Sequence, residues 1–392
     1  MFVPSKDELG KRVKGLQAYL SEAEIEGALL FHIANLYYYT GRVGPGSLFV
    51  PGQGEPVFLS RQRGELPEDL PWQAAHFKRW SDLAGTLGDF GYKVKGRLGL
   101  EMEAIPAAVY MRVHEVWPED ALVDVGTQIR RQRAVKSPWE IEVLRETARR
   151  DQTIFQKVPE FIAASTTDVD LTALFEAEAR RLGHIGMLRV HSFSMEMSMS
   201  CILTGENGAA LSTYDVPTSG TGLGKVFPMG ACGSRLHPGK PILIDFSGCY
   251  FGYNTDLTRM FVIGTPPQEV MEAYKLALHI QAELVLAAKP GALCGELYER
   301  AFAIARQTGL GDSFMGAAGG VSFVGHGVGL EVDELPVLAR GARQALQEGM
   351  VIALEPKFVF QRHGAVGIEN IFVVTHRGLE KLSLVPDDFV VC

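Results

Sequence analysis

Three apolar runs of this chain end in an acidic residue, and this pattern constrains the fold more than any other feature of the sequence. The runs are residues 242–245 (ILID), 351–355 (VIALE) and 366–369 (VGIE). Short apolar runs rich in branched residues are typical of buried strands, and a buried carboxylate without a partner is strongly unfavourable. The fold therefore has to bring these acids to a shared source of positive charge.

The acids fall into two segments of similar design. Asp245 and Asp256 lie 11 positions apart, Glu355 and Glu369 lie 14 apart, and each pair belongs to a stretch that is typical of a β-hairpin. Arg259 is one arginine close enough in sequence to neutralise an acid, whereas a pair of divalent cations would neutralise all four. The two hairpins predict two related halves around one metal site.

His326 adds a nitrogen ligand to these acids. It lies in residues 325–329 (GHGVG), where glycines allow the backbone to bend sharply and the ring to approach an ion. Four carboxylates and one imidazole form an oxygen-rich donor set, which favours Mn²⁺, Fe²⁺, Co²⁺ or Zn²⁺ over thiolate chemistry. We therefore predict two divalent metal ions, held by Asp245, Asp256, His326, Glu355 and Glu369.

The length of 392 residues indicates two domains. An amphipathic helical pattern over residues 6–25 is followed by a strand-like run from residue 27, and such alternation continues over about the first 125 residues. Residues 137–140 (SPWE) then form a capping-box signature with proline at the first helical position. We expect an α/β domain at 1–130 and a metal-binding domain at 131–392.

The second domain has its own order of elements. A helix is expected to start at residues 167–170, strands and glycine-rich loops dominate from about residue 187, and two helical patterns cover residues 268–288 and 294–308. The last 45 or so residues return to strands. Segregated helices and hairpins of this kind predict an α+β fold.

Composition excludes some partners. The net charge is −8, so no basic field spreads over the chain to hold nucleic acid or an anionic membrane. No run approaches the roughly 18 apolar residues of a membrane-spanning helix, and the first residues lack the apolar stretch of a signal peptide. The five cysteines are far apart and form no CxxC pair, which favours reduced thiols and a cytoplasmic location.

Four motifs resemble the successive metal-binding motifs of the M24 metallopeptidases, a family that includes Xaa-Pro aminopeptidase, prolidase and creatinase-like proteins. They are IDFSGCYFGYNTDLTR, GHGVGLEVDELP, ALEPKF and GIEN, and the resemblance covers about residues 130–390. The phrase ANLYYYTGR resembles the N-terminal domain of the creatinase and prolidase branch. The resemblance implies a pita-bread catalytic domain preceded by a creatinase-type α/β domain, and a homodimer.

The resemblance also implies a role for each ligand. Asp245 would chelate one ion, Asp256 and Glu369 would bridge both, and His326 and Glu355 would each bind one. Two metals hold a water that attacks a carbonyl group, and Glu355 would be the catalytic proton shuttle.

Two positions depart from the family motifs. Asp333 replaces a histidine that follows the glycine-rich ligand motif, and Ser212 takes the place of another histidine upstream, where Tyr214 or Asp215 is an alternative equivalent. A carboxylate at 333 opposes the growth of negative charge during amide hydrolysis but suits a cationic substrate. We assign Asp333, Ser212 and Arg259 as candidate substrate-binding residues, with an ion pair between Arg259 and a site acid as the alternative.

Three functions remain open from the sequence. The first is hydrolysis of a C–N bond in a short peptide or other small molecule, as in an Xaa-Pro dipeptidase or aminopeptidase. The second keeps the metals but acts as a hydrolase or lyase on a small cationic substrate that is not a peptide. The third is a non-catalytic pita-bread binding protein, against which the retention of all five ligand residues argues.

Overall fold

The computed structural model describes residues 2–62, 66, 69–119, 121–316 and 320–392. The chain divides into two compact units, Met1–Arg133 and Ala134–Cys392. Among the described residues, no helix has the length and apolar character needed to cross a membrane.

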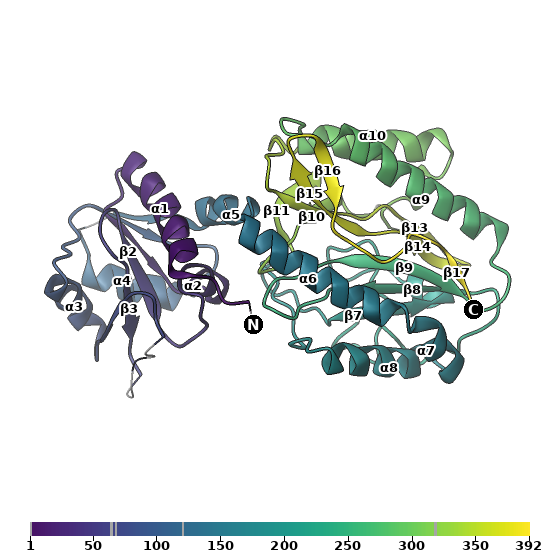
Figure 1. Ribbon diagram of the computed structural model, residues 1–392, viewed down its shortest axis with the longest axis horizontal. Helices are drawn as coiled ribbons and strands as arrows, with labels where there is room; N and C mark the ends of the chain where they lie inside the picture. The colour runs from purple at the N-terminus through teal and green to yellow at the C-terminus, as the bar shows by residue number, and fades with distance from the viewer. Residues whose placement is uncertain (1, 63–65, 67–68, 120, 317–319) are drawn as a thin grey trace. The chain divides into compact units, whose positions relative to one another are not determined.

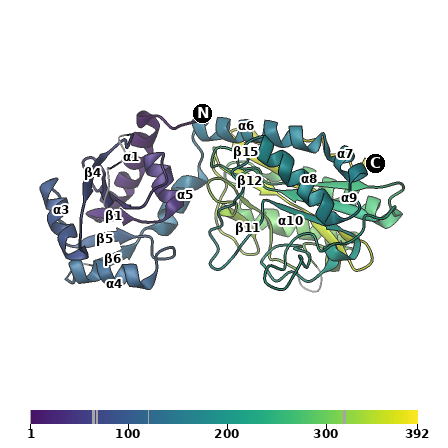
Figure 2. The ribbon, with the colours of Figure 1, turned by 90° about the horizontal axis from the view of Figure 1, so that it is seen from below.

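The N-terminal unit is built on one six-stranded mixed sheet with the strand order β4-β3-β2-β1-β5-β6. Its strands are β1 (Gly27–Leu30), β2 (Ser47–Pro51), β3 (Val57–Ser60), β4 (Gln73–His76), β5 (Arg97–Leu100) and β6 (Ala121–Asp124). Its helices are α1 (Lys6–Glu22), α2 (Ile33–Thr40), α3 (Leu83–Asp89), α4 (Ala107–Val116) and α5 (Gly126–Ala134). Helices α1 and α4 lie on opposite sides of the sheet (Figure 2), which is why all four residues of β1 are buried.

Helix α1 confirms the amphipathic pattern of the sequence. The Ser5 hydroxyl caps the helix by accepting a hydrogen bond from the Glu8 backbone N–H. The residues three or four apart that the pattern placed on one face are buried together, namely Leu9, Val13, Leu16 and Leu20.

The described residues of the C-terminal unit form three sheets. A four-stranded sheet has the order β17-β9-β8-β7, a five-stranded sheet has the order β11-β10-β12-β15-β16, and β13 and β14 form a two-stranded ribbon. The strands are β7 (Ser200–Thr204), β8 (Pro241–Phe246), β9 (Leu257–Val262), β10 (Phe323–Gly327), β11 (Glu334–Ala339), β12 (Val351–Leu354), β13 (Lys357–Phe360), β14 (Gly364–Gly367), β15 (Asn370–Thr375), β16 (Gly378–Lys381) and β17 (Val390–Val391).

Helices cover these sheets in two groups (Figure 1). The first group is α6 (Pro138–Phe155), α7 (Val158–Ala164) and α8 (Asp168–Arg181), and the second is α9 (Gln268–Ala287) and α10 (Cys294–Gln307). The first group shares a buried apolar core with β7, β8 and β9, whereas the second packs on β10, β12, β13 and β14. The predicted capping box is confirmed at Ser137 and Glu140, which open α6.

Both predicted hairpins are present. Strands β8 and β9 pair antiparallel, and so do β12 and β15, but the second pair encloses the two-stranded ribbon β13–β14. A single antiparallel bridge between Thr258 and Glu369 links the two larger sheets. The acids of one hairpin therefore meet those of the other.

Candidate metal centre

The four predicted acids lie at the ends of paired strands. Asp245 is the penultimate residue of β8, and Asp256 directly precedes β9. Glu355 directly follows β12, and Glu369 directly precedes β15. Antiparallel pairing places Glu355 next to Glu369, whereas Asp245 lies opposite Thr258 and therefore diagonally across from Asp256. The bridge at Glu369 brings the two hairpins together.

One half of the centre is arranged around His326 of β10. Its Nε2 lies 3.5 Å from Glu355 Oε1, 3.8 Å from Asp256 Oδ2 and 3.9 Å from Glu369 Oε1. Ligand atoms of Asp256, His326 and Glu369 all lie within 4.8 Å of one another. Donors that each lie about 2.0–2.2 Å from one ion are themselves separated by roughly 3–4 Å. This half therefore has the spacing of a site for one ion.

The charges of this half also fit a cation. Glu369 is 1% exposed, and among the described residues its Oε1 has no hydrogen-bond partner. Burial raises the pKa of Asp256 well above its usual value, and the neighbouring charges of Glu369 and Asp245 raise it further. Buried carboxylates that repel one another and leave an oxygen unpartnered fit a divalent metal ion between them.

The other half of the centre contains a lysine that the sequence analysis missed. Lys357, the first residue of β13, places its Nζ 2.7 Å from Glu355 Oε2, 2.8 Å from Glu369 Oε2 and 3.2 Å from Asp245 Oδ2. Burial by itself lowers the pKa of this lysine, but the three carboxylates raise the pKa well above its usual value. The signal in the sequence is Lys357 itself, which lies two residues after Glu355 in an otherwise apolar strand.

The ribbon β13–β14 fixes the position of this lysine. Lys357 pairs with Gly367, and the side chain of Lys357 runs across the glycine. A Cβ atom at position 367 would lie 2.6 Å from Lys357 Cγ and 2.6 Å from the Pro356 carbonyl oxygen. Only glycine gives the lysine room to reach the acids from this register.

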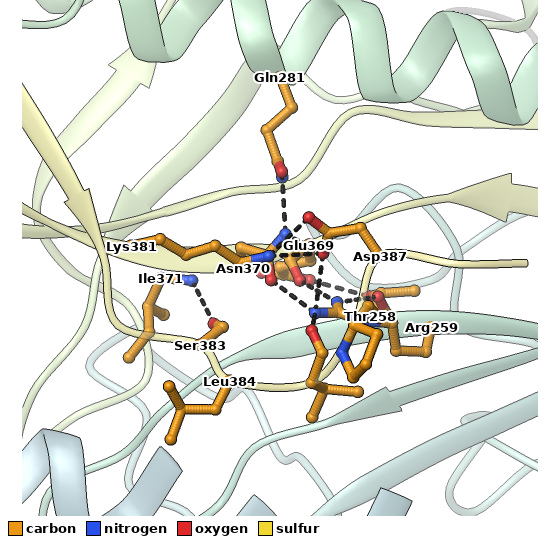
Figure 3. A network of polar contacts seen from close by, with 12 residues as sticks. Thr258, Arg259, Gln281, Glu369, Asn370, Ile371, Lys381, Ser383, Leu384 and Asp387 are labelled. Carbon is orange, nitrogen blue, oxygen red and sulfur yellow. Dashed lines mark hydrogen bonds and ion pairs between the residues drawn. The ribbon is translucent and has the colours of Figure 1, made fainter. Parts of the chain in front are cut away.

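Arg259 lies in a network of polar contacts next to Glu369 (Figure 3). It is 1% exposed, and its Nη1 donates to the carbonyl oxygens of Thr258 and Glu369 at 2.8 and 2.7 Å. Its Nη2 donates to Asn370 Oδ1 at 2.7 Å, and Asp387 Oδ1 lies 3.1 Å from the same nitrogen. The Thr258 hydroxyl meanwhile donates to Glu369 Oε2 at 3.0 Å.

This placement favours the alternative interpretation of Arg259. The remaining donors of the guanidinium bind the carbonyl oxygens of Pro386 and Val385 at 2.7 and 2.6 Å. A side chain buried to this extent and bonded to main-chain oxygens positions Glu369 and does not face a substrate.

Asp333 anchors a loop. Its Oδ1 accepts a hydrogen bond from the His191 backbone N–H at 2.7 Å, and its Oδ2 accepts from the backbone N–H and the hydroxyl of Ser192 at 3.1 and 2.8 Å. His191 Nδ1 lies 3.6 Å from Glu331, a buried acid two residues before Asp333. Both oxygens of Asp333 are thus engaged by the protein itself.

Ser212 lies in the 210–215 turn. Its hydroxyl donates to the Tyr214 carbonyl oxygen at 2.8 Å and accepts from the Tyr214 backbone N–H at 3.1 Å. Within the described ranges, no hydrogen bond joins Ser212 to the five ligand residues. Its hydroxyl stabilises the turn.

A further buried acid lies beside the centre. Asp151 of α6 is 1% exposed and accepts a hydrogen bond from the hydroxyl of Thr255, the residue before Asp256. Burial raises the pKa of Asp151 to about 7, against the opposing effect of the Thr255 hydrogen bond. Folding therefore favours the protonated form of this carboxyl group.

The variant Asp151→Asn should become more stable than the wild type at alkaline pH. A carboxyl whose pKa is raised on folding contributes its full stability below about pH 4 and loses it as the pH rises through about 7. At pH 8.5 the free energy of unfolding of the variant should exceed that of the wild type by about 2–4 kcal/mol, and at pH 4.5 the two should be close.

Urea denaturation of both proteins at the two pH values, with the same metal content, measures this difference. The exposed Asp388→Asn change is the control for removal of one negative charge. An equal gap between Asp151→Asn and the wild type at both pH values would contradict the assigned protonation.

Comparisons with known proteins identify the family of each domain. The family model of metallopeptidase family M24 matches the sequence at residues 142–376, which is more than half of the chain. The family model of the creatinase/prolidase N-terminal domain matches residues 12–135. The first match contains all five predicted ligand residues.

Individual relatives extend over almost the whole chain. An Xaa-Pro dipeptidase of Pyrococcus furiosus is 26% identical, with 95% of this chain and 97% of the relative covered. The crystal structure of the prolidase from Pyrococcus horikoshii superposes with a TM-score of 0.77 at 23% identity, covering 96% of this chain and 99% of that one. The structure of an Xaa-Pro dipeptidase from Bacillus anthracis superposes with a TM-score of 0.80 at 21% identity, covering 98% of this chain and 100% of that one.

The fold expected from the sequence is confirmed, with a creatinase-type N-terminal domain followed by a pita-bread domain. Members of the matched family are hydrolases that use divalent metal ions, and the half of the centre around His326 fits such an ion. On these grounds the chain belongs to metallopeptidase family M24.

Proposed function

We propose that this protein is a dipeptidase that cleaves Xaa-Pro dipeptides with a divalent metal ion. The observation that carries the proposal is the convergence of Asp256, His326, Glu355 and Glu369 within an M24 domain. The sequence match with a relative named Xaa-Pro dipeptidase also covers 97% of that relative, so both domains are included. These four side chains are the proposed ligands.

In the proposed reaction, side chains of the protein transfer the proton and position the ligands, whereas activation of water and of the substrate carbonyl group depends on the ion. A bound divalent ion supplies a Lewis acid that polarises a carbonyl group and activates water. Glu355 Oε1 faces the cluster around His326, 3.5 Å from its Nε2, and is the group we assign to take a proton from water and return it to the leaving nitrogen. Thr258 and Arg259 hold Glu369 in place by hydrogen bonds to its carboxylate and its carbonyl oxygen.

The donor set supports Mn²⁺, Co²⁺, Zn²⁺ or Fe²⁺ as the ion, because it combines one imidazole with carboxylates. We further propose a cytoplasmic homodimer. Support for the location comes from the five cysteines, all of which are free, and support for the dimer comes from the resemblance to the creatinase and prolidase branch.

The Xaa-Pro assignment is favoured over a small cationic substrate. The cationic alternative needs Asp333 as a counter-ion, and both oxygens of this residue already accept hydrogen bonds from His191 and Ser192. A carboxylate whose oxygens already accept hydrogen bonds from the protein binds a cationic ligand less strongly than a free carboxylate does.

The test compares substrates on the metal-loaded protein. We expect kcat/KM for Ala-Pro and Leu-Pro to exceed that for Ala-Ala and Leu-Leu by at least about tenfold, and a chelator to abolish cleavage. The variant Asp333→Asn should keep this preference. Turnover of small cationic amides without dipeptide cleavage, lost in Asp333→Asn, would replace the proposal by the alternative.

A further inference from the structure

The lysine in the metal centre changes the number of ions that the centre holds. We propose that the ammonium group of Lys357 takes the place of a second metal ion, so that this chain binds a single divalent ion at the half formed by Asp256, His326, Glu355 and Glu369. The inference rests on the metal centre of the proposed function but not on the Xaa-Pro substrate.

The ammonium group donates hydrogen bonds to Glu355 and Glu369, and Asp245 lies within ion-pair distance of it. Glu355 Oε2, Glu369 Oε2 and Asp245 Oδ2 lie at 2.7, 2.8 and 3.2 Å from Nζ. A lysine ammonium has three N–H donors and no acceptor, and distances of about 2.7–2.9 Å are those of charge-assisted hydrogen bonds. Nζ therefore lies where an ion shared by these three oxygens would have to lie.

Glu355 and Glu369 each divide their two oxygens between the two halves. Oε1 of each residue is directed towards His326, at 3.5 and 3.9 Å, whereas Oε2 of each binds Lys357. Glu369 Oε2 also accepts from Thr258, while Glu369 Oε1 has no hydrogen-bond partner among the described residues. The Oε2 atoms of Glu355 and Glu369 are therefore already bound by donors of the protein, whereas their Oε1 atoms are available to a cation.

The lysine side chain is held in this place. It is 2% exposed on β13, and its backbone is fixed by pairing with Gly367 and by a 2.8 Å hydrogen bond from the Met315 backbone N–H to its carbonyl oxygen. An ion entering the second half would have to displace a buried ammonium group and leave it without its partners, which is strongly unfavourable.

The charges are nearly balanced by one ion. A divalent ion and one ammonium group bring three positive charges to the four carboxylates of Asp245, Asp256, Glu355 and Glu369. One negative charge then remains on the cluster. Two ions were expected from the sequence because the four acids had no other known source of positive charge, and Lys357 supplies part of that charge.

The experiment counts ions and does not depend on turnover. Wild-type protein equilibrated with excess free Mn²⁺ should hold one ion per chain by elemental analysis, and its electron paramagnetic resonance spectrum should lack the signature of a spin-coupled Mn²⁺ pair. The variant Lys357→Gly, which frees three carboxylate oxygens and the space of the side chain, should hold two ions and show the coupled signal.

A matched control is the other buried lysine of this unit that pairs with a glutamate. Lys136 lies 2.9 Å from Glu334 and contacts none of the proposed ligands by an ion pair among the described residues. Lys136→Gly should keep one ion.

The inference is overturned by two ions or none in the wild type, by a coupled signal in the wild type, or by a folded Lys357→Gly variant that still holds one ion. If Lys357→Gly fails to fold, the wild-type count and spectrum decide. A wild type that holds one ion but does not cleave Xaa-Pro dipeptides would refute the proposed substrate and leave this inference standing.

Discussion

Replacement of Glu355 by glutamine is expected to lower kcat for Xaa-Pro dipeptides by about 10²–10⁴-fold. Glutamine fills the same space between His326 and Lys357, which contact the two oxygens of Glu355. It cannot take a proton from water and return it to the leaving nitrogen. Since substrate binding does not require this transfer, KM should change far less than kcat. Steady-state kinetics of the metal-loaded variant measure both constants.

The control for this variant is Glu380→Gln, which makes the same chemical change at a surface glutamate paired with Arg145 at 2.6 Å. Its kcat should equal that of the wild type. Asp256, His326 and Glu369 remain to hold the ion in Glu355→Gln. The metal content of the variant is measured in parallel, so that a loss of activity caused by a loss of the ion is recognised. An unchanged kcat in a fully loaded variant would remove Glu355 from the proton transfer.

The variant Arg259→Met should lose about 3–5 kcal/mol of stability. Methionine replaces the length of the side chain but none of its hydrogen bonds. The carbonyl oxygens of Thr258, Glu369, Val385 and Pro386 would each lose a donor, and the bonds to the first three are buried (Figure 3). Asn370 and Asp387 would also lose their contacts with the guanidinium.

Calorimetry should show the melting temperature of the C-terminal unit reduced by about 10 °C in Arg259→Met. The matched control is Arg149→Met, since the ion pairs of Arg149 with Glu142 and Glu146 lie on the surface, where such pairs contribute at most about 1 kcal/mol. Equal melting temperatures for the two variants would mean that the network around Arg259 is not required for folding.

Elements specified by nearby residues could be predicted from the sequence. The capping box of α6 depends on Ser137 and Glu140, three positions apart, and the buried face of α1 depends on a spacing of three or four. The hairpin β8–β9 follows from two apolar runs joined by a short connection. In each case the residues that specify the element lie within its own segment.

Features that depend on distant segments could not be predicted in the same way. Asp333 is satisfied by backbone groups at positions 191 and 192, about 140 residues earlier in the chain. The position of Lys357 depends on the ribbon that the chain inserts between β12 and β15. The pattern of acids predicted a shared source of positive charge, and the structure brings the four acids and His326 close together. The register of the ribbon places the ammonium group of Lys357 among them.

The pairing of Lys357 with Gly367 makes the residues at these two positions depend on each other. Any side chain at position 367 would meet Lys357 Cγ and the Pro356 carbonyl oxygen at 2.6 Å, so a lysine arising at position 357 beside a larger residue would be excluded from the acids. Glycine at 367 is compatible with a small residue at 357, whereas lysine at 357 is not compatible with a side chain at 367. The residue at 367 therefore limits which side chains position 357 accepts, and the two positions are constrained as a pair.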